Sequence, residues 1–245
     1  MGVRSRLKHL FKKAELSPSK GDLTDDEYYA DLFTKSEAWN TPFPNFEEKL
    51  RWDIVKNYVF YVLGYFSRTH NGKAINILDL GCGRGWLTNL LAEYGNVTGI
   101  EPVKSVVDYG KTLFPQLELL CGTATDILAQ GKAGRFDLIV CSEVIEHIPD
   151  DKKTCFLAEI SLLLKKDGFL IVTTPRKDAQ TEWLKYINPG QPVEDWLFEA
   201  ELELLLQNNG FIKHHLSRFS IQPIPSAPPI EIYQLWLVQK ASTFQ

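Results

Sequence analysis

From about Lys73 onward, short apolar runs alternate with segments of helical periodicity, and no other feature of the sequence constrains the fold as tightly. The apolar runs are bounded by Gly, Pro, Asp or Asn, as is typical of buried strands. Between them, apolar residues recur at the period of a helix with one buried face. Strands and helices that alternate in this way form a parallel sheet with helices on both faces. The predicted strands are residues 74–80, 97–100, 117–121, 136–141 and 169–174, and the predicted helices between them are residues 86–94, 104–113 and 152–165.

The C-terminal part of the chain has a different pattern. A helix over Glu199–Asn208 is predicted to end at Gly210, since glycine readily adopts the left-handed conformation that closes helices. Two apolar strands follow, at residues 211–219 and 232–239, with only a proline-rich loop between them. No crossover helix fits in that loop, so the two strands are expected to pair antiparallel. The sequence therefore predicts an α/β fold with a mostly parallel sheet and an antiparallel last strand.

The region before Lys73 is expected to form a cap rather than part of the sheet. Residues 47–66 predict one long helix, and an aromatic and proline-rich stretch at residues 39–45 precedes it. We interpret residues 1–72 as a basic tail and helical cap, and residues 73–245 as the sheet domain. In residues 1–20, six Lys and Arg side chains oppose one acid, Glu15. This excess is interpreted as a solvated terminus, and a basic amphipathic helix on a membrane or an RNA is the alternative.

Composition excludes several other classes of protein. The chain has 245 residues, 44% of them hydrophobic and 24% charged, the balance of an ordinary globular protein. Its formal net charge of −4 argues against a nucleic-acid partner bound over the whole surface. No apolar run is long enough to span a bilayer. The four cysteines lack paired spacing, which indicates a reducing compartment, so we expect a cytoplasmic location.

A glycine-rich segment, Gly81-Cys-Gly-Arg-Gly85, follows the first predicted strand and opens a helix. Glycines in this position let the backbone approach a nucleotide-like ligand closely. Asp79, at the end of the strand, would repel the phosphates of a dinucleotide but suits a ligand with an ammonium or sulfonium group. Glu101 ends the next strand, where a carboxylate accepts hydrogen bonds from both hydroxyls of a ribose. S-adenosyl-L-methionine, with a cationic amino acid at one end and a ribose in the middle, fits all three features.

Four motifs resemble those of class I S-adenosylmethionine-dependent methyltransferases. They are Ile77-Leu-Asp-Leu-Gly-Cys-Gly-Arg-Gly-Trp86, Gly99-Ile-Glu-Pro102, Phe136-Asp-Leu-Ile-Val-Cys-Ser-Glu-Val-Ile-Glu-His-Ile148 and Leu164-Lys-Lys-Asp-Gly-Phe-Leu-Ile-Val-Thr-Thr-Pro175. The sequence is most similar to the branch that contains the ubiquinone-biosynthesis O-methyltransferases and many natural-product methyltransferases. The resemblance covers residues 73–245 and implies a Rossmann-like, seven-stranded, mostly parallel sheet whose last strand is antiparallel.

The same resemblance implies a set of residues around the cofactor S-adenosyl-L-methionine. Those implied at its methionine end are Asp79, Gly81, Cys82 and Gly83. Those implied at its ribose and adenine are Glu101, Pro102, Thr123 and Ala124. Those implied where the fourth-strand loop passes the cofactor are Cys141 and Ile145.

Two positions depart from the pattern of the family. After the third strand the family usually has Gly-Asp-Ala, whose Asp binds the adenine amino group, whereas this chain reads Gly122-Thr123-Ala124. Thr123 can accept a hydrogen bond but brings no charge, which leaves the Ala124 amide as the other adenine contact. Arg51 is the best match to an Arg that approaches the carboxylate of the cofactor in ubiquinone-type enzymes, although the linker that follows it is longer here.

Methyl transfer from a sulfonium is a direct displacement, which requires an aligned acceptor and a dry site. A general base matters when the acceptor is a hydroxyl of high pKa. The candidates are Glu143, Glu146 and His147, after the fourth strand. His147 is the preferred one because the usual pKa of histidine suits proton transfer near neutral pH. The alternative is a histidine that only starts a helix and bonds to backbone.

The segment Glu143-Val-Ile-Glu-His147 also resembles the metal-binding stretch of small-RNA 2′-O-methyltransferases. In those enzymes two Glu and a His bind a divalent ion with a downstream His, which is absent from the matching region of this chain. Glu194 or Asp195 could replace it. We assign no metal site and keep this activity as an alternative function.

The acceptor is expected to be a small molecule, with its hydroxyl on a phenol, quinol or sugar. Aromatic side chains in the cap and in residues 183–198 suggest a flat or sugar-like shape, although most of them are expected to fix the cap by burial. Two other functional classes are kept as alternatives. A dinucleotide oxidoreductase is disfavoured by Asp79 and the spacing of the glycines, and a non-catalytic S-adenosylmethionine-binding protein would show the same motifs.

Overall fold

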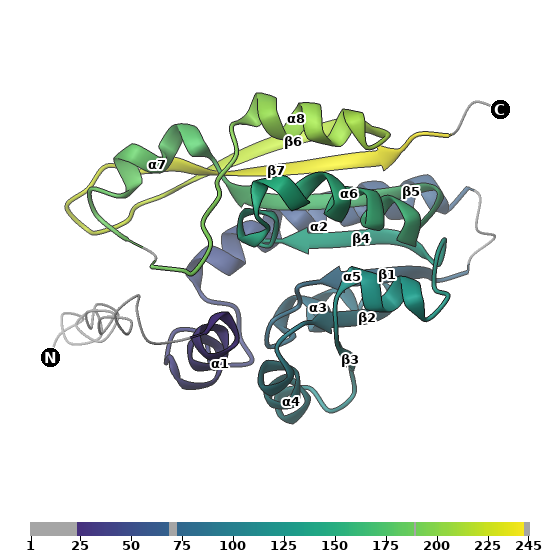
Figure 1. The fold of residues 1–245 in the computed structure, drawn as a ribbon, viewed down its shortest axis with the longest axis horizontal. Helices are drawn as coiled ribbons and strands as arrows, with labels where there is room; N and C mark the ends of the chain where they lie inside the picture. The colour runs from purple at the N-terminus through teal and green to yellow at the C-terminus, as the bar shows by residue number, and fades with distance from the viewer. Residues whose placement is uncertain (1–23, 69–72, 189, 243–245) are drawn as a thin grey trace, which may run out of the picture.

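The computed structural model describes residues 24–68, 73–188 and 190–242 and contains a seven-stranded sheet (Figure 1). The strand order is β3-β2-β1-β4-β5-β7-β6. All neighbours pair in parallel except that β7 runs antiparallel to both β5 and β6. The strands are β1 Ile75–Leu80, β2 Gly95–Glu101, β3 Glu118–Cys121, β4 Phe136–Ser142, β5 Leu164–Pro175, β6 Phe211–Ile221 and β7 Ile230–Lys240. The predicted fold class is therefore confirmed.

Helices connect the strands on both faces of the sheet (Figure 1). The helices of the strand-bearing region are α3 Trp86–Leu91, α4 Lys104–Leu113, α5 Ala124–Ala129, α6 Asp150–Leu163, α7 Lys177–Trp183 and α8 Glu199–Asn208. Several boundaries differ from the predictions by a few residues, and the one between α6 and β5 differs most. The predicted helix over residues 152–165 ends at Leu163, and Leu164 already pairs with Phe136 as the start of β5. The register of β4 against β5 shifts between Phe136 and Leu138, as at a bulge. This shift accommodates the early start of β5.

The two faces of the sheet form two hydrophobic clusters because side chains alternate along each strand. On β5, Phe169 and Ile171 belong to one cluster, whereas Leu170 and Val172 belong to the other. The second cluster is completed by the buried faces of α5, α6 and α8. Both faces of the central strands are thus dry, as expected for a parallel sheet.

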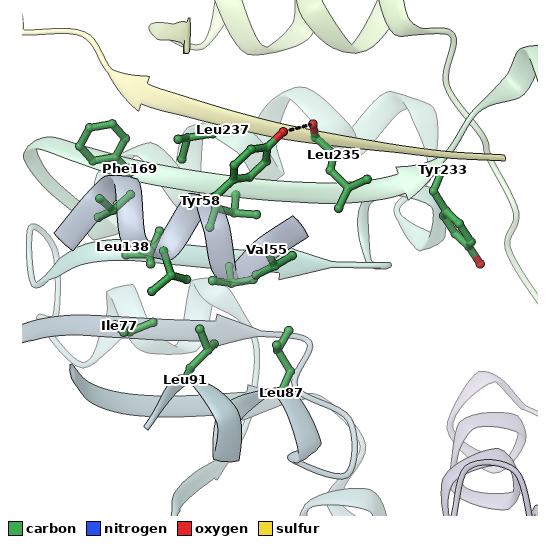
Figure 2. Packing of buried hydrophobic residues seen from close by; sticks show 14 of the residues in the cluster. Val55, Tyr58, Ile77, Leu87, Leu91, Leu138, Phe169, Tyr233, Leu235 and Leu237 are labelled. Carbon is green, nitrogen blue, oxygen red and sulfur yellow. Dashed lines mark hydrogen bonds between the residues drawn. The ribbon is translucent and has the colours of Figure 1, made fainter. Parts of the chain in front are cut away.

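Before the first strand lie two further helices, α1 Asp25–Lys35 and α2 Phe46–Phe66. Helix α2 covers the first cluster, where Val55 and Tyr58 pack among side chains of β1, β4, β5 and β7 (Figure 2). The hydroxyl of Tyr58 donates a hydrogen bond to the Leu235 carbonyl at 3.1 Å. This helix is therefore part of the same core as the sheet. The basic tail inferred from residues 1–20 lies outside the described residues.

Of the helices within the described ranges, none combines the length and the apolar character that crossing a membrane requires.

Candidate active site at the carboxyl edge of the sheet

The glycine loop connects β1 to α3 and has left-handed backbone at each of its glycines. Gly81, Gly83 and Gly85 have φ angles of 78°, 50° and 89°. A Cβ on Gly81 would lie 2.3 Å from Cγ2 of Val144, in the loop that follows β4. The absence of a side chain therefore lets the loops after β1 and β4 approach each other closely.

Asp79 lies beneath this loop, at the end of β1, and is almost fully buried. Its Oδ2 accepts a hydrogen bond from the Thr88 hydroxyl at 2.6 Å. Burial, with a smaller contribution from the nearby Glu101 carboxylate, raises the pKa of Asp79 to about 7 against the opposing effect of the hydrogen bond from Thr88. A cationic group bound beside Asp79 would favour its charged form.

Glu101 ends β2 and holds the glycine loop from the other side. Its Oε2 accepts a hydrogen bond from the Gly83 amide at 3.2 Å, and its Oε1 accepts one from the Val103 amide at 3.1 Å. Val103 is the N-cap of α4, so this carboxylate joins the loop to the start of a helix. Burial raises the pKa of Glu101 to about 7.

Thr123 is the N-cap of α5, and its side chain is engaged within its own turn. Its amide and its hydroxyl each donate a hydrogen bond of 2.8 Å to Oδ2 of Asp126. Ala124 follows it and is buried, and Pro102 lies exposed after β2. The sequence interpretation missed Asp126, which supplies a carboxylate at the turn where a negative charge had been judged absent. The Thr-x-x-Asp spacing of a capping box was the available signal.

The loop after β4 carries the candidate proton-transfer residues. Cys141 and Ile145 are buried in the second cluster, and residues Ile145–His147 form a short 3-10 helix. Glu143 has a φ of 57°, a left-handed conformation that non-glycine residues rarely adopt. Such backbone strain is often found where a side chain is held for function.

Glu143 is held by two partners. Its Oε1 accepts a hydrogen bond from the Thr173 hydroxyl at 2.8 Å, and its Oε2 lies 3.3 Å from a terminal guanidinium nitrogen of Arg51. Burial raises the pKa of Glu143 to about 7 against the opposing effect of Arg51. The guanidinium of Arg51 also lies 4.9 Å from the centre of the Tyr233 ring. Among the described residues, none accepts a hydrogen bond from the buried Nε of Arg51.

Glu146 is the most deeply buried of the three candidates. It accepts a hydrogen bond from the Thr174 hydroxyl at 3.0 Å, and burial raises its pKa to about 7. Its Oε1 lies 3.9 Å from Nε2 of His147.

The imidazole of His147 is oriented by the backbone. Its Nδ1 lies 2.8 Å from the Val193 carbonyl oxygen, which can only accept a hydrogen bond. Nδ1 therefore carries the proton, and Nε2 presents a lone pair. Burial lowers the pKa of His147 below its usual value of 6.5, which favours the neutral ring. An imidazole whose tautomer is fixed in this way is suited to accept a proton.

Helix α1 crosses the carboxyl edge of the sheet and contacts both sides of the site. The Phe33 ring lies 3.0 Å from the position of a Cβ on Gly83, and the Tyr29 ring centre lies 5.6 Å from that of His147. The same helix therefore covers the glycine loop and the loop after β4.

No group of three or more His, Cys, Asp or Glu side chains within the described residues is arranged to hold a metal ion. Asp195, one of the candidate substitute ligands, instead forms an ion pair with the buried Lys153 at 3.2 Å.

Comparison with known proteins identifies the family. A family model described as a methyltransferase domain matches residues 52–216. The chain belongs to this family. The match spans the glycine loop, Glu101 and His147, whereas α1 and Arg51 precede it.

Relatives of this methyltransferase domain include ubiquinone biosynthesis O-methyltransferases. The protein of that name from Coxiella burnetii (strain RSA 493) is 35% identical over 115 residues, which cover 46% of this chain and 48% of the relative. The one from Caulobacter sp. (strain K31) is 34% identical over 152 residues, which cover 55% and 58% of the two chains. The chain thus spans about half the length of the curated relatives it matches.

Solved structures show the same fold. The PH0226 protein from Pyrococcus horikoshii has a TM-score of 0.63 at 18% identity, with 87% of this chain and 98% of that one covered. The magnesium protoporphyrin IX methyltransferase from Synechocystis, solved with bound S-adenosylmethionine, has a TM-score of 0.59 at 17% identity, with 90% and 99% covered.

Proposed function

We propose that this methyltransferase uses S-adenosyl-L-methionine to methylate a hydroxyl of a small molecule, with His147 as the general base. The observation that carries the proposal is the orientation of His147, whose Nδ1 donates to the Val193 carbonyl and whose Nε2 is left as a proton acceptor. The loop that bears this ring packs on Gly81 through Val144. The base and the glycine loop are thus neighbours at one edge of the sheet.

In this proposal the cofactor lies along that edge. Asp79 and the backbone of the glycine loop would bind its methionine end, and Glu101 would bind the ribose hydroxyls. Arg51 would pair with the carboxylate of the cofactor. Its buried Nε supports this role, because none of the described residues accepts a hydrogen bond from that atom. The turn at Thr123 would hold the adenine.

The chemical step needs no further cofactor. The acceptor oxygen attacks the methyl carbon, an O–C bond forms, and the C–S bond breaks with its electron pair retained by sulfur. The hydroxyl proton passes to Nε2 of His147, and S-adenosylhomocysteine leaves. Helix α1 would exclude water while the two substrates are aligned, which is the main task in a displacement of this kind.

Two observations favour a neutral hydroxyl over an anionic acceptor. Glu143 and Glu146 flank the proposed base, and Arg51 is already paired with the former. An acceptor with a carboxylate or phosphate would therefore be repelled by whichever of these two carboxyl groups is ionised. The names of the curated relatives, which are O-methyltransferases, also support oxygen as the acceptor atom.

The proposal is tested by transfer of a labelled methyl group to a panel of phenols, quinols, sugars and small RNAs, with and without a metal chelator. Methylation of a phenol, quinol or sugar that survives chelation is expected. Chelator-sensitive labelling of RNA alone would instead support the metal-dependent 2′-O-methyltransferase. Binding of S-adenosylhomocysteine without transfer to any acceptor would support a non-catalytic binding protein.

A further inference from the structure

Arg84, in the middle of the glycine loop, points away from the proposed cofactor site and into the segment that precedes α2. Its side chain is completely buried. Its Nε donates to the Thr41 carbonyl at 2.7 Å, and one terminal nitrogen donates to the Phe43 carbonyl at 3.1 Å. A buried guanidinium is tolerated only where its charge and its donors are matched. The loop is thus attached to residues 41–43 by a specific side chain.

The charge of Arg84 is matched by Glu48. The two terminal nitrogens of Arg84 donate to the two carboxylate oxygens of Glu48 at 2.8 and 2.7 Å, a bidentate pair. Glu48 is also the third residue of α2, and its Oε2 accepts a hydrogen bond of 2.8 Å from the Asn45 amide in a capping box. One carboxylate therefore fixes both the glycine loop and the first turn of α2.

Arg51 lies one turn further along the same helix and pairs with Glu143. Residues three apart share a helix face, so Glu48 and Arg51 are neighbours on α2. The start of this helix consequently contacts the loop after β1 through one ion pair and the loop after β4 through the other. The ion pairs of Arg84 with Glu48 and of Arg51 with Glu143 form a brace across the site.

We propose that Arg84 and Glu48 are positioning residues, which hold the glycine loop in register with Arg51 and Glu143 through the first two turns of α2. The inference rests on the proposed function, because it assigns these residues a part in binding that cofactor. Neither side chain needs to touch the cofactor. The backbone of Arg84 also packs closely against α4, since its carbonyl oxygen lies 3.0 Å from the position that a Cβ on Gly110 would take.

The test is calorimetric titration of S-adenosylhomocysteine into the full chain and its variants. Glu48→Gln keeps the shape of the side chain but removes its charge, and Arg84→Lys keeps the charge but removes the bidentate geometry. Each is expected to weaken binding by about 10-fold, the order of magnitude of coupling between linked sites. The double variant is expected to bind no more weakly than the weaker single variant, because the two residues act as one unit.

A matched control separates positioning from a general loss of stability. Asp137 is as deeply buried as Glu48 and pairs with Lys165 at 2.7 Å, at the opposite end of β4. Asp137→Asn is expected to lower the unfolding temperature but to leave the affinity for S-adenosylhomocysteine within about twofold, as for independent sites. Wild-type affinity in Glu48→Gln, or an equal loss of affinity in Asp137→Asn, would overturn the proposal.

The link from α2 to the loop after β4 is tested by combining Glu48→Gln with Glu143→Gln. If the brace transmits position, the effects of the two changes on affinity are not multiplicative, and multiplicative effects would overturn this link. If Arg84→Lys does not fold, the two glutamine variants decide the outcome. Failure of the wild-type chain to bind S-adenosylhomocysteine would instead contradict the proposed function itself.

Discussion

At the scale of single residues, the site depends on atoms whose partners are already fixed before any ligand binds. His147 shows this most clearly, because a backbone carbonyl selects its tautomer. Burial lowers its pKa, so the ring loses its proton at a lower pH than a free histidine does. A base of this kind is active once the pH exceeds its own pKa.

Replacing His147 by Gln tests its assignment as the general base. Turnover is expected to fall by about 10²- to 10⁴-fold, the usual contribution of a positioned base, while the affinity for S-adenosylhomocysteine stays near that of the wild type. Labelled methyl transfer to the best acceptor of the panel, followed from pH 5 to 9, measures this. The acidic limb of the wild-type profile should lie below pH 6.5 and be lost in the variant. Unchanged turnover would remove His147 from the mechanism.

Gly81 is the residue at which the addition of a single methyl group is expected to lower stability most. Gly81→Ala places a Cβ 2.3 Å from Val144 and forces alanine to a φ of 78°. A loss of about 2 to 4 kcal/mol in the free energy of unfolding is expected from strain and overpacking together, with weaker cofactor binding.

The control for this change is Gly131→Ala. Gly131 has a similar φ of 74°, but no atom lies within 4 Å of its Cβ position. For Gly131→Ala, only the strain of the left-handed backbone is expected, a loss of about 1 kcal/mol in the free energy of unfolding. Urea unfolding of both variants gives the comparison, and equal losses would show that the contact with Val144 is unimportant.

At the scale of elements, the strands were predictable because apolar runs and their boundaries are local features. The predicted helix over residues 104–113 has the observed limits of α4. The end of α6 was not predictable, since Leu164 joins β5 through a pairing with Phe136 that only the folded sheet provides. The partner of Arg84 was beyond prediction for the same reason, because Glu48 is distant in sequence and its charge could equally have faced solvent.

Helix α1 is the element whose removal is most informative. Deletion of residues 1–35 keeps Thr41, Phe43 and Glu48, and with them every hydrogen bond of Arg84 to the cap. The truncated chain is expected to bind S-adenosylhomocysteine measurably but to lose turnover, because the helix that covers both Gly83 and His147 is gone. Titration and labelled methyl transfer measure the two effects.

The single change Phe33→Ala is the milder companion of this deletion. It removes only the ring against Gly83, so turnover is expected to fall less than in the truncated chain. Undiminished turnover after the deletion would refute the role of α1 as a lid.

At the scale of the whole molecule, the parallel topology brings the ends of β1, β2 and β4 to one edge, and acidic residues from all three collect there. Of these, Asp79 and Glu101 are almost fully buried beside the glycine loop. Their type and order could be predicted from the sequence. Their raised pKa values could not, because desolvation depends on how completely the loops and α1 close over the edge.

This concentration of buried acids predicts how stability depends on pH. The pKa values of Asp79 and Glu101 rise from 3.8 and 4.5 when the chain is unfolded to about 7 when it is folded. Between these limits the folded state binds more protons than the unfolded state, so the free energy of unfolding falls as the pH rises from about 4 to about 7. Each group contributes at most about 1.4 kcal/mol per pH unit in this window.

Urea unfolding of the ligand-free chain at pH 5.5, 6.5 and 7.5 measures this slope. Asp79→Asn, which has no charge to desolvate, should make the slope shallower, with the contribution of Glu101 remaining. Saturating S-adenosylmethionine should also flatten the slope, because a cation beside Asp79 stabilises the ionised carboxylate of the folded state. A ligand-free stability that rises with pH across this window would mean that Asp79 and Glu101 are ionised in the folded chain, and that the carboxyl edge is wetter than its burial indicates.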